Sequence, residues 1–578
     1  MIGGEFLTGT LAAEDVFTPE DFTEEHRAVR KTVDEFWRKE AEPVLDPIAH
    51  KDHDAAVGLL RKSCELGLTG VVVPEVYGGM EMDLTSAMIV AEGLARDGSY
   101  AGWHGAHAGI GTLPVLLFGT EEQKRRYLPR LVAGELIGAY ALTEPHAGSD
   151  ALAVKTRADL NAEGTHYVQN GSKMWITNAG KADLFTVFAK IDGAADKFTA
   201  FLVERSAAGV SIGHEEAKMG IQGSSTCAVY FDNVAVPVGN VLGEIGRGHI
   251  IAFNILNLGR LKLGPFAVGG AKQVLKVSAA YAQERQAFGG PIARFGLIQA
   301  KLAEMAVRIF AAETLSYAVC GFIESRLTGF DWSAPDAARV KLKAIEEFAA
   351  ECSMVKVYAS EVLDYVVDEG VQIHGGYGYH QDYLVERAYR DSRINRIFEG
   401  TNEINRLLAT GMLLKRAVRG QLDLVGAVKR VQAALMEPPS PGSRLTPAAA
   451  AKSITLLALG AAYARFRDHL EQQQEVLAAL TDAAMGALTL ECAALRAGRM
   501  AGSSKGEVAA DVLAVLNDTT LRTVEDSARL VLAASREGDE LRMSMAALKR
   551  LAKQEPVDVV AARRRIAARV LDAGGWVF

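Results

Sequence analysis

The chain has 578 residues, a formal net charge of −8 and a pI near 5.9, with 49% hydrophobic and 23% charged residues. This length exceeds what one hydrophobic core usually holds, and the acidic balance argues against general nucleic-acid binding. The five cysteines lack C-x-x-C spacing, which argues against a cysteine zinc site and a disulfide framework.

Residues 1–138 are predicted to form a mainly helical domain, because apolar residues recur at helical spacing with charges between them. The first 17 residues have neither a basic region nor an apolar core, so no signal peptide is predicted and a cytoplasmic location is expected. The longest strongly apolar run, near 454–464, is too short to span a bilayer. His104 and His107 have no accompanying carboxylate or third histidine, which favours packing near a ligand pocket over a metal site.

A β-domain is expected over residues 139–248. The sequence there changes to short runs of alternating apolar and polar residues separated by turn residues, including 166–168, 174–177 and 184–190. Asn170-Gly171 stands between two of these runs and predicts a hairpin turn.

Helical periodicity returns in residues 249–436, where three long amphipathic segments at 267–285, 297–325 and 337–367 predict an up-and-down bundle. Residues 437–447 are rich in proline and are predicted to be a linker. Residues 448–578 are rich in alanine and leucine and are expected to form a separate helical domain. The predicted fold class is mainly α with an inserted β-domain.

Glu399 lies where a loop leads into a helical pattern, followed by Gly400 and Thr401. Such a loop leaves backbone N–H groups free to meet an oxygen ligand. A carboxylate beside amide donors suits removal of a proton next to a carbonyl, because the donors stabilise the negative charge that develops. From these residues alone, a solvated or dipole-stabilising carboxylate is the alternative interpretation.

Several separate blocks in one order resemble the acyl-CoA dehydrogenase family, and within it the very-long-chain-like branch with an extra C-terminal helical domain. The resemblance covers roughly residues 22–415. The blocks are YALTEPHAGSD at 140–150, NGSKMWITN at 170–178, KMGI at 218–221, RQAFG at 285–289, FGLIQ at 295–299, QIHGGYG at 372–378 and RINRIFEGTN at 393–402.

The resemblance implies a helical N-terminal domain, a β-barrel-like middle domain and a four-helix bundle, with FAD between the last two. It implies that Ser149 contacts flavin phosphate or coenzyme A and that Gly400 contacts the substrate. Arg260 is expected to contact the coenzyme A portion of the substrate or to position its helix. Arg285, Phe288, Gln372 and Gly376 are expected to reach the FAD of a neighbouring subunit. The remaining FAD-binding residues that it implies are Tyr140, Thr143, Trp175, Thr177, Thr401 and Glu403.

In this family a carboxylate removes the α-proton of an acyl-CoA thioester while the β-hydride passes to flavin N5, and the product is the trans-2-enoyl-CoA. The resemblance assigns this role to Glu399. Members with the base on an earlier helix place it where this chain has Gly259, which cannot abstract a proton. The chain departs from the family at Ala287, where many members have threonine, and at Glu403, where some have glutamine.

The resemblance also implies partners. Electron-transfer flavoprotein is the expected electron acceptor, and an oxidase using oxygen is the alternative; the Glu-Gly-Thr-Asn block favours the dehydrogenase. A long-chain substrate is implied, and the preferred length is left open. A homodimer is expected rather than a tetramer, and the basic C-terminal helices suggest peripheral membrane association. A non-enzymatic, flavin-binding DNA-associated protein is the alternative of another class, and no nucleic acid is expected.

Overall fold

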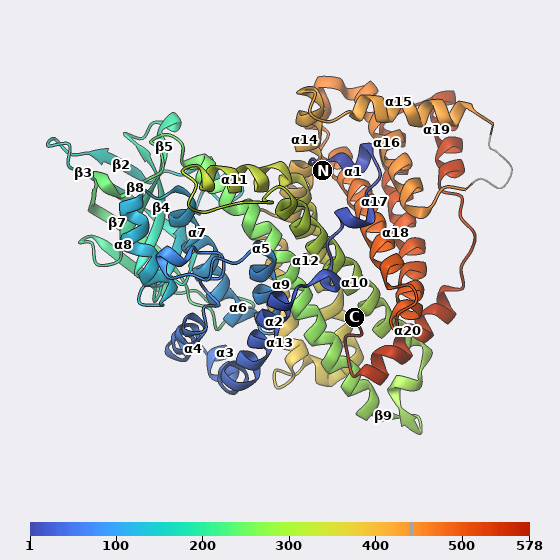
Figure 1. The fold of residues 1–578 in the computed structure, drawn as a ribbon, viewed down its shortest axis with the longest axis horizontal. Coiled ribbons are helices and arrows are strands. Elements are labelled where there is room, and N and C mark those ends of the chain that lie inside the picture. Colours follow the sequence, from blue (N-terminus) through green and yellow to red (C-terminus); the bar gives the residue numbers. More distant parts are fainter. Residues whose placement is uncertain (439–443) are drawn as a thin grey trace.

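The computed structural model describes residues 1–438 and 444–578, so part of the predicted linker at 437–447 lies outside the described residues. Figure 1 shows the β-strands at one end of the molecule, the helices α16–α20 at the other end, and the bundle helices α9, α10 and α12 between them. The predicted class, mainly α with an inserted β-domain, is confirmed.

Five of the main N-terminal helices begin at a side chain that caps the first turn. Thr23 Oγ1 accepts a hydrogen bond from the backbone N–H of His26 at 3.2 Å. Thr120 and Gln123 form a reciprocal capping box. The main helices of this part are α2 (Glu24–Phe36), α4 (His53–Glu65), α5 (Leu84–Leu94), α6 (Gly98–Gly105), α7 (Leu113–Phe118) and α8 (Glu121–Val132), with a π-helical segment, η6 (Ala106–Gly111).

Eight strands form one sheet in the order β6-β7-β3-β2-β4-β5-β8, with β1 paired to β4, and β9 (Gln286–Ala287) pairs separately with β10 (Gly290–Pro291). No ladder joins β6 to β8 among the described residues, so the sheet is open rather than a closed barrel. The strands are β1 (Gly138–Ala141), β2 (Arg157–Leu160), β3 (His166–Thr177), β4 (Leu184–Ile191), β5 (Phe198–Glu204), β6 (Val210–Glu215), β7 (Thr226–Pro237) and β8 (Val241–Leu242).

The hairpin predicted at Asn170-Gly171 was wrong. These residues lie inside β3, where the register against β7 shifts between Gln169 and Gly171. Gly171 has a φ of 154°, and a Cβ there would lie 2.5 Å from Thr156 Oγ1. The glycine therefore permits a β-bulge and the close approach of a neighbouring segment, which produces the same sequence signal as a turn.

Four long helices form the bundle: α9 (Gly248–Glu284), α10 (Gly296–Ser325), α12 (Ala349–His374) and α14 (Asn402–Val418). A Cβ on Gly264 of α9 would lie 2.4 Å from Ser316 Oγ and 2.5 Å from Val355 Cγ1, so this glycine allows α9 to approach α10 and α12 closely. The single helix predicted at 337–367 is in fact two, since the chain leaves helical geometry at Phe348. Shorter helices are α11 (Ala337–Glu347), α13 (Leu384–Ser392) and α15 (Leu424–Met436).

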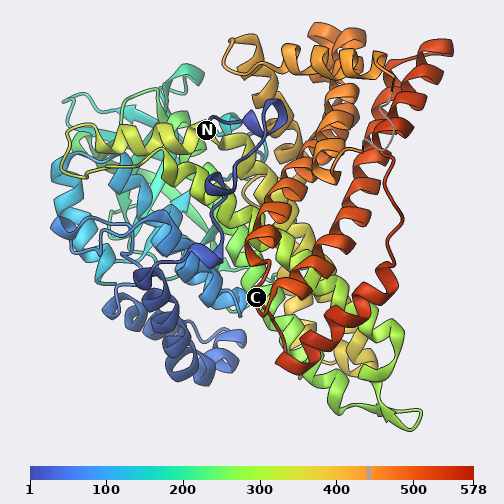
Figure 2. The same cartoon turned by 45° about the vertical axis from the view of Figure 1, so that its right-hand side comes forward.

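The C-terminal helices lie along the bundle (Figure 2). Arg496 of this domain is fully buried and forms ion pairs with Glu313 of the bundle at 2.7 Å and with Glu20 at 2.9 Å. Removing one partner of such a buried pair would leave an uncompensated charge, so the pairs fix how the domain docks. The helices are α16 (Pro447–Phe466), α17 (Gln474–Met500), α18 (Gly506–Ser535), α19 (Gly538–Leu551) and α20 (Val559–Ala573).

The first residues of the chain also pack at this junction, away from the other N-terminal helices. The backbone N–H of Gly4 donates to Glu351 of α12 at 2.6 Å, and that of Leu11 donates to Glu491 of α17 at 3.1 Å. The short helix α1 (Glu5–Thr8) therefore contacts the bundle side of the molecule, although its position in the sequence had assigned it to the N-terminal domain.

Three helical segments are long and apolar enough to cross a membrane by length and composition alone. They are 296–325, 447–472 and 474–500, and 89%, 61% and 89% of their most apolar windows are buried inside the protein. The prediction that the apolar run near 454–464 is too short to span a bilayer was therefore wrong by length and composition, because the run continues in the apolar helical segment 447–472.

Candidate active site

A cavity of about 170 Å³ lies between the N-terminal helices and α9. Its wall consists mainly of apolar and small residues from α5, α6, η6 and one face of α9. Thr177 from the end of β3 and the segment from Ile394 to Glu399 also line it. The β-domain, the bundle and the N-terminal domain therefore meet at one cavity, and its apolar lining suits an aliphatic chain.

The loop that carries Glu399 is held in an unusual conformation. Glu399 has a φ of 57° and Gly400 a φ of 81°, so two successive residues occupy the left-handed region. Arg260 Nε donates to the Glu399 carbonyl oxygen at 3.1 Å, and Lys356 Nζ donates to the Gly400 carbonyl oxygen at 2.7 Å. Asn405 donates to the carbonyl oxygens of Gly400 and Thr401 at 2.8 and 3.0 Å.

This anchoring leaves the amide side of the loop free. Because the C=O and N–H of one peptide unit point in opposite directions, carbonyl groups bound to the bundle turn the following N–H groups away from it. In the described part of the chain, the backbone N–H groups of Glu399, Gly400 and Thr401 donate to no acceptor. The donors predicted beside the carboxylate are therefore available to a ligand oxygen.

The Glu399 carboxyl group lies against Gly259 of α9. A Cβ built on Gly259 would lie 2.7 Å from Oε2 and 2.8 Å from Cδ, so only glycine leaves room for this carboxyl position. Oε2 is buried and has no hydrogen-bond partner among the described residues. Burial raises the pKa of Glu399 to about 7, although Arg260 and Lys356 act in the opposite direction.

Gly259→Ala should therefore impair the site without unfolding the protein. The new methyl group would displace the carboxyl group by several tenths of an ångström, and we expect kcat to fall about 10- to 100-fold. Steady-state kinetics of purified holoprotein would measure this. Gly411→Ala in α14 is the matched control, because a Cβ there meets nothing within 4 Å. Equal kinetics for the two variants would contradict the contact between Gly259 and Glu399.

The pH profile should report the Glu399 carboxyl group. A base acts in its ionised form, and the pKa of this group lies at about 7 in the fold. We expect kcat/KM to rise with pH and to level off above about 7. A profile already flat at pH about 5 would mean that this carboxyl group is an ordinary exposed acid.

Residues of the β-domain fit a flat ring beside this cavity. Trp175 has a φ of 58° at a second irregularity of β3, and its side chain is 59% exposed although it is a large aromatic. Tyr140 on β1 has a buried hydroxyl with no partner among the described residues, and burial raises its pKa. An exposed indole, an unpartnered hydroxyl and Thr177 at the cavity wall leave surfaces that a planar, polar-edged group would cover.

The other residues predicted near the cofactor or substrate are placed as follows. Thr143 follows β1, its carbonyl oxygen accepting from Met174 N–H at 2.9 Å, and Ser149 is exposed in the next loop. Thr401 caps α14, and Glu403 is exposed in the first turn of that helix. Arg260, predicted to contact the substrate or to position its helix, is 4% exposed, and its Nε donates to the Glu399 carbonyl oxygen.

The second group of predicted residues lies at the far end of α9 and α12. Arg285 ends α9, with its guanidinium 5.5 Å from the centre of the Tyr377 ring. Phe288 is 89% exposed and has a φ of 52°. Gln372 and Gly376 are exposed near the end of α12. The structure therefore does not bring these four residues to the Glu399 cavity within one chain.

Sequence reasoning missed two of the side chains that shape the site. Lys356 is fully buried and holds both Gly400 O and Asn402 Oδ1 at 2.7 Å. A lysine inside the apolar run from Ser353 to Val357 was a signal that could have been used. Asn405, which binds three successive carbonyl groups, had no comparable signal.

Comparisons with known proteins agree with this geometry. The chain matches the acyl-CoA dehydrogenase N-terminal domain at 23–135, the middle domain at 139–234 and the C-terminal domain at 246–413, and a further acyl-CoA dehydrogenase C-terminal domain at 450–550. It is 46% identical to a "Probable acyl-CoA dehydrogenase" of Bacillus subtilis over 99% of this chain and 98% of the relative.

Two further matches bear on the branch and the fold. The very long-chain specific acyl-CoA dehydrogenase of Rattus norvegicus is 41% identical over 63% of this chain and 53% of its own length. A crystal structure of an acyl-CoA dehydrogenase complexed with FAD from Bacillus anthracis superposes with a TM-score of 0.97 at 46% identity, covering 100% of both chains. The chain therefore belongs to the acyl-CoA dehydrogenase family and is an oxidoreductase of that family.

Proposed function

We propose that the protein catalyses the FAD-dependent α,β-dehydrogenation of a saturated, long-chain fatty acyl-CoA to the trans-2-enoyl-CoA. The observation that carries the proposal is the Glu399 carboxyl group, buried without a partner over Gly259 in an apolar cavity and beside free backbone donors. The long-chain expectation is supported by relatives named for very long-chain substrates.

The residues of this chain divide the chemistry between them. The thioester oxygen accepts hydrogen bonds from the free N–H groups of the Glu399 loop, which strengthen as negative charge develops there. Glu399 takes the α-proton, and its raised pKa makes it a stronger base than an exposed glutamate. FAD, when bound, supplies the oxidant that accepts the β-hydride. The apolar wall excludes water from the reacting carbons.

The residues that would hold FAD fall into two groups, which supports a homo-oligomer. Tyr140, Thr143, Trp175 and Thr177 would cover or border the ring in one subunit, while Arg285 and its neighbours would reach the phosphates and adenosine of another. Large apolar side chains are exposed within or near this second group in the sequence, as is common where subunits meet. Phe288, Leu297, Tyr377 and Tyr379 are 89%, 81%, 49% and 86% exposed. A homodimer is the proposed form.

Electron-transfer flavoprotein is the proposed electron acceptor, and an oxidase that uses oxygen is the second candidate. The Glu-Gly-Thr-Asn sequence at 399–402 favours the dehydrogenase. Turnover in air, measured as hydrogen peroxide release, separates the two: an oxidase releases peroxide in proportion to enoyl-CoA, and a dehydrogenase does not.

A cytoplasmic location with peripheral membrane association is also proposed. The basic C-terminal helices offer weaker support for it than their composition suggests, since some of these side chains already bind groups of the same chain. Arg563 pairs with Glu304 of α10 at 2.9 Å, and Arg550 Nη1 donates to the Leu435 carbonyl oxygen at 2.8 Å. The same pairing leaves less positive charge to bind DNA, which the alternative function, a flavin-binding DNA-associated protein, would require.

Anaerobic titration of the purified flavoprotein with saturated acyl-CoAs tests the proposal. We expect loss of the flavin absorbance near saturation with one equivalent of a preferred substrate, and trans-2-enoyl-CoA as the product. Protein without a flavin, or a flavin that no acyl-CoA reduces, would overturn the proposal.

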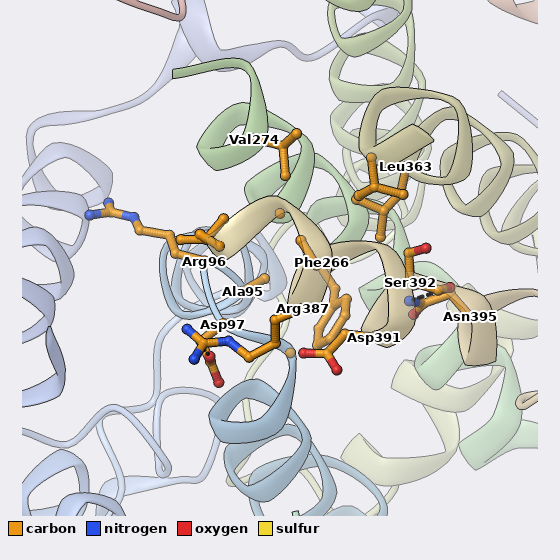
Figure 3. A pocket seen from close by; sticks show the side chains of 15 residues that line it. Ala95, Arg96, Asp97, Phe266, Val274, Leu363, Arg387, Asp391, Ser392 and Asn395 are labelled. Carbon is orange, nitrogen blue, oxygen red and sulfur yellow. Dashed lines mark hydrogen bonds and ion pairs between the residues drawn. The ribbon is translucent and has the colours of Figure 1, made fainter. Parts of the chain in front are cut away.

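Phe266 should limit the length of the acyl chain. Its ring lines the main cavity and also stands in a second cavity of about 40 Å³ between α9, α12 and α13 (Figure 3). Phe266→Ala would join the two cavities, so we expect kcat/KM to shift toward longer acyl-CoAs by about 10-fold in the ratio of long to short substrates. Rates over an acyl-CoA length series measure this, and an unchanged length preference would show that the chain does not run toward Phe266.

A further inference from the structure

Lys262 is a charged side chain in the wall of the acyl cavity. It lies on α9 one turn after Gly259 and one turn before Phe266, and all three residues line the cavity. Lys262 is partly exposed, and it lines the cavity. In the part of the chain that the structure describes, no hydrogen bond or ion pair reaches its ammonium group.

The surroundings of Lys262 offer no negative charge. Burial and the neighbouring Lys341 lower the pKa of Lys262 to about 8, so the amine is still mostly protonated at neutral pH. The cations that act on the Glu399 carboxyl group are Arg260 and Lys356, and Lys262 is not among them. The ammonium group therefore lies apart from the catalytic base, further along the cavity face of α9.

A second polar group in the same wall also lacks a partner. His104 of α6 lines the cavity, and its Nε2 is buried without a hydrogen bond among the described residues. Burial, His107 and Lys262 lower the pKa of His104 to about 3, against the opposing effect of a backbone hydrogen bond with Leu68, so the ring is neutral. His107 differs, because its ring binds the Leu131 carbonyl oxygen at 3.0 Å and the Gly138 N–H at 3.1 Å.

Stability does not account for this arrangement. A buried ammonium group without a counter-ion weakens a fold, and methionine would fill the same space without that cost. A methyl-ended acyl chain in the cavity would bury the charge further and still leave it unpaired. A ligand that carries its own negative charge would satisfy it.

We propose that Lys262 binds a carboxylate on the distal part of the acyl group, with His104 as a second polar contact, so that the substrate is an acyl-CoA with an anionic far end. This inference rests on the proposed function, which it narrows from fatty acyl-CoAs in general to dicarboxylyl-CoAs. A charge-assisted hydrogen bond of this kind discriminates strongly between substrates, because a methyl-ended acyl chain leaves the ammonium group unpaired.

Matched acyl-CoA pairs test the inference with the purified holoprotein. The pairs are octanoyl- and suberoyl-CoA, decanoyl- and sebacoyl-CoA, and hexadecanoyl- and hexadecanedioyl-CoA. We expect one length at which the carboxylate-ended member has a kcat/KM about 10- to 100-fold above its methyl-ended partner. The ω-hydroxy analogue of that length should react more slowly than the carboxylate. A preference for methyl-ended chains at every length, or for the hydroxyl over the carboxylate, would overturn the inference.

Variants at Lys262 supply the second arm. Lys262→Met should abolish the preference within the best pair, and Lys262→Arg should retain part of it, while Lys343→Met, an exposed lysine of α11, should leave the ratio unchanged. Lys262→Met should also raise Tm, because an unpaired buried charge is removed. A lower Tm with an unchanged preference would make Lys262 a structural residue.

The two proposals fail in different ways. If no acyl-CoA of either kind reduces the flavin, the proposed dehydrogenation fails. If only methyl-ended chains reduce it, dehydrogenation stands and the carboxylate site does not.

Discussion

Glu399→Gln should bind acyl-CoA and FAD yet leave the flavin oxidised. The amide keeps the size of the side chain over Gly259 and cannot accept the α-proton, so we expect the rate of flavin reduction to fall by about 10⁴-fold. Anaerobic stopped-flow absorbance measures the reduction, and the spectral change on adding ligand measures binding. Glu346→Gln, an exposed glutamate of α11, removes the same charge away from the cavity and should reduce at the rate of the unaltered protein.

Two results would contradict this assignment. Flavin reduction within a factor of a few of the unaltered rate would mean that another base takes the proton. Oε2 makes no hydrogen bond among the described residues, so replacing the carboxyl group by an amide breaks none there. Loss of FAD or of ligand binding in the variant would therefore mean that Glu399 has a structural role.

The same variant should gain stability at neutral and alkaline pH. The pKa of Glu399 is raised from an ordinary 4.5 to about 7, so the folded protein holds the carboxyl proton more tightly than the unfolded chain does. Ionising this carboxyl group therefore lowers the free energy of unfolding of the unaltered protein. The loss is absent below pH about 4.5, grows as the pH rises and is complete above about 7, where it amounts to about 3 kcal/mol. Thermal unfolding of both proteins across this range would show the difference in Tm widen with pH.

The sequence alone pointed to Glu399 as the candidate base because the pattern around it is local. Glu399, the glycine after it and the helix that follows are adjacent in the chain, and the family blocks place them in a known order. The left-handed backbone at Glu399 could not be predicted, because it depends on Arg260, Lys356 and Asn405, which reach the loop from α9, α12 and α14. No local propensity favours a glutamate with a φ of 57°.

Predictions that depended on local signals alone failed where tertiary contacts changed their meaning. Asn170-Gly171 has the composition of a hairpin turn, but a neighbouring segment packed against Gly171 makes it a bulge inside β3. Helical periodicity continued through Phe348, although the chain leaves helical geometry there. In both places the hydrophobic pattern identified the element type and missed the irregularity that positions it.

Arg260 separates two interpretations of the site. The family resemblance predicted either a contact with the coenzyme A portion of the substrate or a role in positioning the helix. In the structure the buried side chain donates through Nε to the Glu399 carbonyl oxygen at 3.1 Å and through Nη1 to Asn257 Oδ1 at 3.0 Å, which favours the positioning role. Arg260 also opposes the effect of burial on the Glu399 pKa. These contacts make it a positioning residue that holds the loop and tunes the base.

Arg260→Met should therefore lower kcat about 100-fold with little change in KM. The pH range over which kcat/KM rises, here called the pH limb, should move to higher pH. The carboxyl group loses the nearest cation that favours its ionised form, so its pKa rises. Arg260→Lys should restore most of the pH limb because the charge remains. It should restore less of kcat, because an ammonium group lacks the planar fork that bonds both Glu399 O and Asn257.

A substrate-binding role would give the opposite pattern. If Arg260 contacts coenzyme A, Arg260→Met raises KM, leaves kcat near its original value and leaves the pH limb in place, because Glu399 keeps its environment. Measuring kcat, KM and the pH limb on the two variants decides between these roles, since only a residue that acts through Glu399 moves the limb.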